Sequence, residues 1–398
     1  MNSTTTAKYN IPFAALILLL ASLTAFGPLS IDMYLPAFPA IAENLGVPLS
    51  SVQLSLASFF VGLATGQIFY GPLTDRYGRK KPLYVGLGIY AVASVVCTFT
   101  KNVEMLIAFR FLQALGSCSG VVISRAIVRD LFTHQETAKV FSLLMLVMGA
   151  APILAPVLGG QISEHFGWRM IFALLAVIST LCIVLIATFL PETHHPDQRV
   201  HIKDSWKIYG SILKDRNFMG YALAGGAAQA GMFAYITGSS FVFINHFGIP
   251  AKSFGWVFGS NAVGLILCSQ INTRLLKRLS YDAILEKIFV VLAVLGALLA
   301  TAGILNWGFW GIMIPLFLFI ASLGMTFPNS TAGAMATQKK SAGSASALLG
   351  TLQYGIAALS SAAVSRLHNG TTMPMCVLMG GFGVLALVLH RVIIKRSL

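Results

Sequence analysis

The segment 71–81 reads GPLTDRYGRKK and lies between two long apolar runs, 52–70 and 83–99. It contains one aspartate, two arginines and two lysines, and this many charges cannot be buried in hydrocarbon at a tolerable cost. We therefore expect a tight loop at one face of a membrane, with Gly71 providing the bend.

The composition of the whole chain supports a membrane protein. Only 10% of its 398 residues are charged and 56% are hydrophobic, whereas a soluble domain has about 25% charged residues. The net charge of +14 would favour nucleic acid as a partner in a soluble protein. Here the basic residues cluster in alternate loops without base-stacking aromatics among them, which argues against nucleic acid binding.

Long apolar windows recur along the chain, and each matches the roughly 20 residues that span a bilayer as a helix. The windows are 11–35, 52–70, 83–99, 103–124, 140–161, 168–190, 217–244, 254–271, 284–305, 308–328, 342–364 and 373–394. They predict an all-α integral membrane protein with twelve transmembrane helices. We interpret the first window as a retained span rather than a cleaved signal, because many others follow it.

Orientation follows from the loops, because cytoplasmic loops are rich in Lys and Arg. Most of the 27 basic residues fall in alternate loops, with Arg125 assigned to one of them. The loops of the other face carry Lys101, Arg169, Lys252 and Arg366. We expect a multi-pass protein of the inner (plasma) membrane with both termini in the cytoplasm.

One long polar stretch divides the spans into six and six. It predicts a six-helix bundle over 1–190, a cytoplasmic linker over 191–216 and a second six-helix bundle over 217–398. Two halves of this kind are common in transporters.

Two charged residues within predicted spans cannot be assigned to a loop or a span end. Asp32 lies near the outer part of the first span and Arg110 lies well inside the fourth. Intramembrane charges usually mark function, and carboxylates are common proton carriers. The alternatives are that Asp32 caps a helix end at the interface and that Arg110 is a structural hydrogen-bond centre.

Uncharged polar residues in the spans are candidates for a substrate cavity: Tyr34, Gln113, Asn261 and Gln353. Each alone could equally cross-link helices. In the fifth span, the segment 149–160 carries Pro152, Pro156, Gly159 and Gly160 among its residues. Because proline removes a helical hydrogen bond, we expect this segment to kink or move.

Several motifs of this chain resemble those of a known family of transporters. The segment 71–81 is similar to the loop between the second and third spans of the major facilitator superfamily. Residues 110–116, RFLQALG, resemble the fourth-span motif of its drug/proton exporters, although Ala114 stands where glycine is usual. The fifth-span segment resembles the antiporter motif with Ala155 in place of its first glycine. Residues 28–36, PLSIDMYLP, and 151–156, APILAP, are similar to the Bcr/CflA group of multidrug exporters.

This resemblance implies the roles of several residues. It implies the major facilitator fold and proton-coupled antiport of amphipathic antibiotics, such as chloramphenicol- or bicyclomycin-like compounds, with consequent multidrug efflux and antibiotic resistance. Proton coupling would involve Asp32 and Arg110, the latter within a motif that includes Gln113 and Gly116. The fifth-span motif would seal the bundle interface. A conformational latch at the cytoplasmic face would comprise Gly71, Asp75, Arg76, Gly78 and Arg79.

Other functions remain as alternatives. One is export of a metabolite such as an amino acid or siderophore, and another is a membrane sensor that does not transport. An enzyme is not expected, because no His, Asp and Glu cluster accompanies Asp32 and no phosphate-binding GxxxxGK[ST] loop is present. We expect no metal and no cofactor, a proton gradient as the energy source, and a monomer whose partners are protons, a small molecule and lipid.

Overall fold

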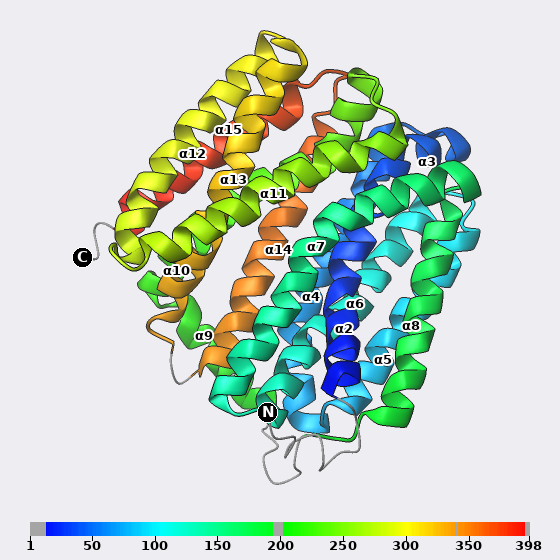
Figure 1. Ribbon diagram of the computed structural model, residues 1–398, viewed down its shortest axis with the longest axis vertical. Coiled ribbons are helices and arrows are strands. Elements are labelled where there is room, and N and C mark those ends of the chain that lie inside the picture. Colours follow the sequence, from blue (N-terminus) through cyan, green and yellow to red (C-terminus); the bar gives the residue numbers. More distant parts are fainter. Residues whose placement is uncertain (1–12, 194–201, 339–340, 395–398) are drawn as a thin grey trace.

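The structure is a computed structural model that describes residues 13–193, 202–338 and 341–394 (Figure 1). The helices are α2 Phe13–Asp32, η1 Leu35–Ala37, α3 Phe38–Leu45, α4 Leu49–Tyr77, α5 Lys80–Phe99, α6 Val103–Leu131, α7 His134–Phe166, α8 Arg169–Phe189, α9 Ile202–Leu213, α10 Arg216–Ser240, η3 Phe241–His246, α11 Ala251–Leu275, α12 Tyr281–Ile304, α13 Gly308–Met335, α14 Ala342–Arg366, α15 Met373–Leu389 and η5 His390–Ile394. The chain ends, and part of the predicted linker, lie outside the described residues.

The prediction of an all-helical protein with twelve spans is confirmed, since twelve helices among the described residues are long and apolar enough to cross a membrane. The first span is longer than predicted and runs over Phe13–Leu45. Its chain breaks at Asp32, passes through the short helix η1 and resumes as α3. The apolar side chains of Phe38 and Ile41 are buried, which anchors α3 against the helices below it.

The helices pack mostly with neighbours from the same half of the sequence (Figure 1). In the first half α6 packs on α4 and α5, and α2 packs on α6 and α7; in the second half α15 packs on α10 and α12, and α13 packs on α11 and α12. Two extensive contacts join the halves, α4 with α14 and α7 with α11. Any space between the halves is therefore bordered by these two helix pairs.

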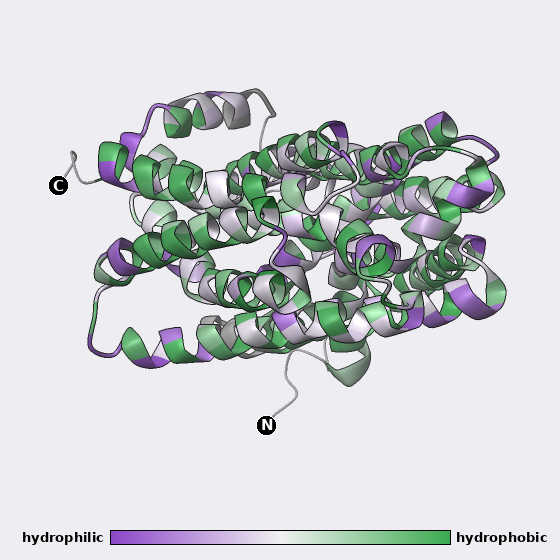
Figure 2. Cartoon of the chain, turned by 90° about the horizontal axis from the view of Figure 1, so that it is seen from above, coloured by the Kyte–Doolittle hydropathy of each residue, from purple (hydrophilic) through white to green (hydrophobic). Residues whose placement is uncertain are grey.

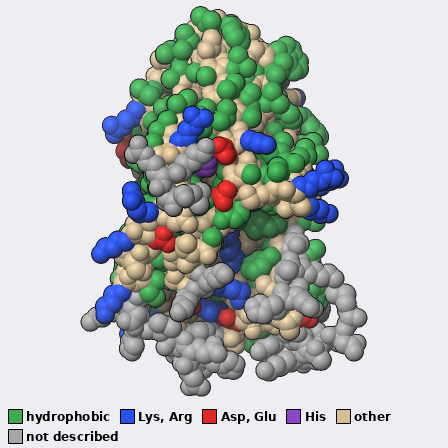
Figure 3. All heavy atoms as spheres, turned by 90° about the vertical axis from the view of Figure 1, so that its left-hand side faces the viewer, with side chains coloured by type: hydrophobic (Ala, Val, Ile, Leu, Met, Phe, Trp, Pro, Cys, Tyr) green, Lys and Arg blue, Asp and Glu red, His purple; other side chains and the backbone are tan. Residues whose placement is uncertain are grey.

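The two ends of the helices differ in charge. Hydrophilic residues gather toward the helix ends and hydrophobic residues occupy most of the middle (Figure 2). We call the end with Arg79, Arg129, α9 and Arg274 the basic face, and the end with α3 and Lys252 the opposite face. Figure 3 looks toward the basic face, where Lys and Arg side chains gather and the surface is hollowed.

The predicted loop at 71–81 is much shorter than expected. Helix α4 continues to Tyr77 and α5 begins at Lys80, so only Gly78 and Arg79 separate the two helices. The bend expected at Gly71 is therefore wrong, and the turn lies at Gly78, whose φ of 85° favours glycine. With 29 residues α4 is roughly 43 Å long and outlasts a hydrocarbon core of about 30 Å. Its charges can thus be helical and still lie outside the hydrocarbon.

The predicted linker contains the helix α9, which the sequence analysis missed. Tyr209 and Ile212 on α9 are buried, and the Tyr209 hydroxyl donates to the carbonyl of Ile68 on α4 at 3.3 Å. Trp206 contacts the Phe69 ring edge-on at 6.0 Å. Because α9 also contacts α10 and α14, it bridges the two halves at the basic face. The three-residue spacing of its apolar side chains was the available signal.

Candidate functional site

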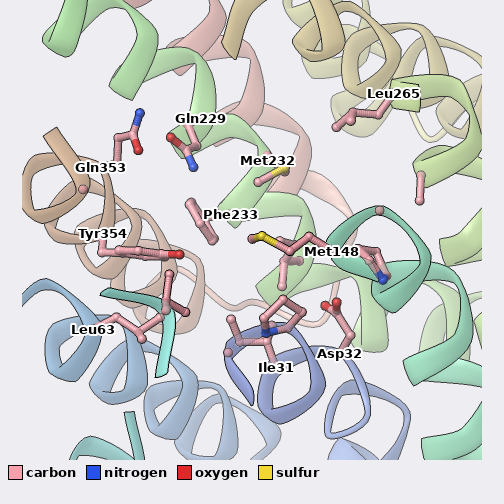
Figure 4. A pocket seen from close by; sticks show the side chains of 18 of the residues that line it. Ile31, Asp32, Leu63, Met148, Gln229, Met232, Phe233, Leu265, Gln353 and Tyr354 are labelled. Carbon is pink, nitrogen blue, oxygen red and sulfur yellow. The ribbon is translucent and has the colours of Figure 1, made fainter. Parts of the chain in front are cut away.

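The end of α2 places Asp32 deep inside the bundle. Asp32 is the last residue of α2 and is only 5% exposed, and the chain continues past it through η1 and α3 toward the opposite face. It is not an interfacial cap of an exposed helix end. Its carboxylate lines a cavity between the two halves (Figure 4).

This central cavity has a volume of about 420 Å³. Its walls come from α2, α4, α6 and α7 of the first half and from α10, α11, α13 and α14 of the second. Apolar side chains such as Met148, Met232 and Phe233 form much of the wall, and Gln229, Gln353 and Tyr354 lie at one side (Figure 4). Such a site suits a molecule with an apolar body and few polar groups.

Two of the four predicted cavity residues line it. Asn261 on α11 and Gln353 on α14 belong to the wall, and the amide of Asn261 donates to the Tyr235 hydroxyl at 3.1 Å. Tyr34 and Gln113 do not line this cavity. Both are fully buried in the first half, so for them the helix-linking role fits the structure.

Arg110 occupies a separate aromatic box within the first half. Its side chain is fully buried, and its guanidinium carbon lies 4.1 Å from the ring centre of Phe59, 4.5 Å from that of Tyr34 and 5.9 Å from that of Phe172. One terminal nitrogen donates to Gln113 at 2.7 Å. The other nitrogen and Nε have no hydrogen-bond partner in the structure, so the aromatic faces provide much of the stabilisation of this charge.

A buried polar network extends from Arg110 toward α2. The amide of Gln113 donates to the Ser94 hydroxyl on α5 at 2.7 Å, and Tyr90 on α5 hydrogen bonds Ser30 on α2 at 2.6 Å. Gly116 allows close packing here, because a Cβ at its position would lie 2.6 Å from the backbone nitrogen of Tyr90. These contacts hold α2, α5 and α6 together next to Asp32. They do not bring Arg110 into an ion pair with Asp32.

Arg125 lines the central cavity, although the sequence analysis assigned it to a loop. It lies on α6, which continues to Leu131, and its side chain is half-buried. The sequence around Arg125 is compatible with an uninterrupted helix, and this was the signal that could have identified Arg125. Its basic residues were instead taken to mark the end of the span. Gln67 on α4 and Met148 on α7 also line the cavity and were not predicted.

A second cavity of about 340 Å³ continues from the central one toward the basic face. Gln67, Arg125 and Ser346 line both, which makes them the junction. The outer cavity also includes Arg129 and Tyr209. The central cavity therefore communicates with the basic face.

The opposite face is closed by contacts between the halves. Gln53 on α4 donates to the carbonyl of Thr237 on α10 at 3.0 Å, and the Ser365 hydroxyl on α14 donates to the carbonyl of Ser50 at 2.6 Å. Lys252 and Glu164 form an ion pair at 3.1 Å between α11 and α7. Asp32 is thus shielded from this face.

The fifth-span motif is part of this closure. A Cβ at Gly159 would collide with the carbonyl of Met33, and one at Gly160 would lie 2.7 Å from the carbonyl of Ala251 in the second half. Pro152 lines the central cavity, and Pro156 lies one turn further along α7. Helix α7 continues through both prolines.

The predicted latch residues form a cluster at the basic face. Arg79 donates to Asp75 at 2.8 Å and to Asp130 at 2.8 Å. The backbone N–H groups of Arg79 and Lys80 donate to Glu192, a contact that the sequence analysis did not predict. Arg76 instead lies over the ring of Tyr77, and Gly71 lies within α4, so these latch residues have different surroundings.

The second half has its own fastening at this face. The carboxylate of Asp215 caps α10 by accepting from the backbone N–H groups of Asn217 and Phe218 and also accepts from Thr337 and Gln338 after α13. Burial by itself would raise the pKa of Asp215, but these hydrogen bonds outweigh it and hold the pKa below its usual range. Among the described residues no group of three His, Cys, Asp or Glu side chains could hold a metal ion.

This arrangement, with a central cavity between two sets of membrane-spanning helices, is that of a membrane transporter. Residues 20–362 match the family described as Major Facilitator Superfamily, and the chain belongs to that family. It is 40% identical over 375 residues to the MFS-type transporter YdgK of Bacillus subtilis, covering 92% of each chain. It is 32% identical to a bicyclomycin resistance protein homolog of Haemophilus influenzae, covering 96% of each.

Further similarities agree with this assignment. Multidrug resistance protein D of Escherichia coli is 29% identical over 92% of this chain and 93% of its own. Among solved structures, a D-xylose–proton symporter superposes with a TM-score of 0.71 at 15% identity, covering 95% of this chain and 97% of the other. At that identity the superposition shows the shared fold.

Proposed function

We propose that this protein exports amphipathic small molecules, antibiotics among them, in exchange for protons. The observation that carries the proposal is the cavity between the halves, which contains the buried carboxylate of Asp32, communicates with the basic face and is closed at the opposite face. The names of relatives as bicyclomycin resistance and multidrug resistance proteins support the substrate class.

The basic face is the cytoplasmic face in this proposal, because Lys and Arg accumulate on the cytoplasmic side of inner-membrane proteins. The structure then corresponds to a state that receives substrate from the cytoplasm. Two bodies, the helices before and after the 191–216 linker, rock about the central cavity. The cavity closes toward the basic face as it opens toward the opposite one.

Asp32 is the proton carrier of this cycle. A carboxylate that lines a transport cavity can take up and release a proton as the cavity opens to each face, and protonation of Asp32 competes with the binding of substrate. Protons enter from the periplasm when the opposite face opens, and release occurs toward the basic face. Asp75, Arg79 and Asp130 fasten the α4–α5 turn to α6 and keep the first half rigid while it moves.

Expression in a pump-deficient bacterial host tests this function. We expect raised resistance to chloramphenicol-like and other amphipathic antibiotics, and drug-induced proton release from energised inverted vesicles. An uncoupler should abolish the transport and leave the amount of protein in the membrane unchanged. Unchanged resistance together with no drug-induced proton movement would refute drug export and favour the metabolite alternative.

A further inference from the structure

Arg125 is a charged residue of the cavity that the proton-coupling scheme does not use. It lies six residues before the end of α6 at Leu131, so its Cα is about 9 Å inside the helix end. A charge at this depth is tolerated when it meets water or a partner of opposite charge. Arg125 lies at the junction of the two cavities, where it can meet either water or an oppositely charged ligand.

No acidic side chain pairs directly with Arg125. Among the described residues, no salt bridge joins Arg125 to another group. Its neighbours at the junction, Gln67 and Ser346, are uncharged. The acidic residue of the outer cavity, Asp75, is bonded to Arg79, and Arg129 adds a further positive charge there. The route from the basic face is therefore electropositive.

The two charges of the central cavity lie at its two ends. Asp32 ends α2, nineteen residues from the basic-face end at Phe13, whereas Arg125 lies near the basic-face end of α6. Their depths differ by about 15–20 Å at 1.5 Å of rise per residue. Between them the wall carries thioether and aromatic groups such as Met148 and Phe233. A molecule bound at Arg125 can thus place its apolar body against this wall, within the cavity that Asp32 also lines.

We propose that Arg125 forms an anion subsite, and that the preferred substrates are amphipathic organic acids with a carboxylate head and an apolar body. The planar guanidinium offers paired donors that match a carboxylate. The electropositive route also raises the local concentration of anions relative to cations. The proposal rests on the proposed export function and names its substrate class.

Binding of three matched probes tests the subsite. The probes are naphthylacetate, its neutral amide naphthylacetamide, and naphthylethylammonium, titrated by calorimetry into the purified full chain in nanodiscs at neutral pH. We expect naphthylacetate to bind about tenfold or more tightly than the amide, since charge-assisted hydrogen bonds are the stronger ones, and the ammonium probe to bind most weakly.

The variants Arg125→Gln and Arg125→Lys separate charge from structure. Arg125→Gln should abolish the preference for the carboxylate and keep the affinity for the amide within about twofold, and Arg125→Lys should retain part of the preference. Arg274→Gln, which removes an exposed charge of the same face away from both cavities, should bind like the wild type. The subsite would be overturned if the wild type bound none of the probes, or if it bound the carboxylate no more tightly than the amide. It would also be overturned if the preference survived in Arg125→Gln, or if that variant lost affinity equally for carboxylate and amide.

Failure of the subsite is distinguishable from failure of the export function. If chloramphenicol still drives proton release from vesicles while the probes behave in any of these ways, the substrate class is wrong and the transporter remains. If no compound moves protons, the export function itself is refuted.

Discussion

Asp32 and Arg110, the two charges that the sequence places within spans, both belong to the first half but face different surroundings. Asp32 lines the central cavity, whereas Arg110 is enclosed by Tyr34, Phe59 and Phe172. Asp32 is positioned to meet substrate and protons, and Arg110 is positioned to hold the helices around it.

The first prediction concerns Asp32→Asn. The variant should fold and bind substrate, because asparagine preserves the shape of the side chain, but it should lose drug-induced proton release since it has no titrating group. Proton release from inverted vesicles and equilibrium binding measure the two properties. Glu43→Gln, a change at an exposed carboxylate of α3, is the control. Full proton-coupled efflux by Asp32→Asn would remove Asp32 from the mechanism.

The second prediction concerns Arg110→Lys. Lysine keeps the charge but loses the planar stacking over Phe59 and changes the donor to Gln113. We expect a loss of about 2–4 kcal/mol in the free energy of unfolding, from one cation–π contact and one charged hydrogen bond. Thermal unfolding in detergent should show a clearly lowered midpoint. An unchanged midpoint would contradict a structural role for the aromatic box.

The third prediction compares two partners of Arg79. Asp130→Asn should cost more stability than Asp75→Asn, because the Asp130 side chain is 19% exposed and that of Asp75 is 52% exposed. Asp130 also accepts from Thr193 at 3.1 Å. The expected loss for Asp130→Asn is about 1–3 kcal/mol. A double-mutant cycle with Arg79→Gln measures each coupling, and equal couplings would disprove the ranking.

The fourth prediction uses Gly160→Ala. The added methyl group would lie 2.7 Å from the carbonyl of Ala251 in the second half, so the closed arrangement at the opposite face should become less populated. Hydrogen–deuterium exchange should then rise in peptides covering 33–45 and 241–250. Gly88→Ala on α5 adds a methyl group where no atom lies within 4 Å and should leave the exchange unchanged. Equal exchange in the two variants would exclude a role for Gly160 in the closure.

The fifth prediction concerns pH and Asp215. Its pKa is held below the usual value of 3.8 in the folded protein. Its contribution to stability is therefore complete above that value and is lost as the pH falls through the lower, folded pKa. Asp215→Asn should lower the unfolding midpoint at neutral pH and reduce the difference from wild type in acid. A variant that matches the wild type at neutral pH would show that the cap contributes nothing.

Much of the fold was predictable because long apolar runs admit little besides spanning helices. Asp32, Asn261 and Gln353 could be found as cavity residues because polar groups in such runs need water or partners. Tyr34 and Gln113 gave the same signal, but their partners are other side chains, Ser55 at 2.8 Å and Ser94 at 2.7 Å. Hydropathy does not distinguish water from a buried partner.

Charge near a span end was the other source of error. The charges after Gly71 were taken to end the helix, and those around Arg125 were taken to lie in a loop. Both helices continue past these charges. With 29 residues each, α4 and α6 are longer than the hydrocarbon is thick, so their charged ends lie outside it. For Arg125 this error concealed a cavity residue.

The two glycines of α7 have a mechanical consequence. Gly159 contacts the backbone of Met33, the residue that follows Asp32, and Gly160 contacts the backbone of Ala251 in the other half. A single turn of α7 is therefore packed between the residue that follows Asp32 and the opposing half. Separation of the halves at this face must break the Gly160–Ala251 contact on the same turn of α7 that packs against the residue after Asp32. If one protonation state of Asp32 favours the arrangement with separated halves, then by reciprocity that arrangement favours the same protonation state.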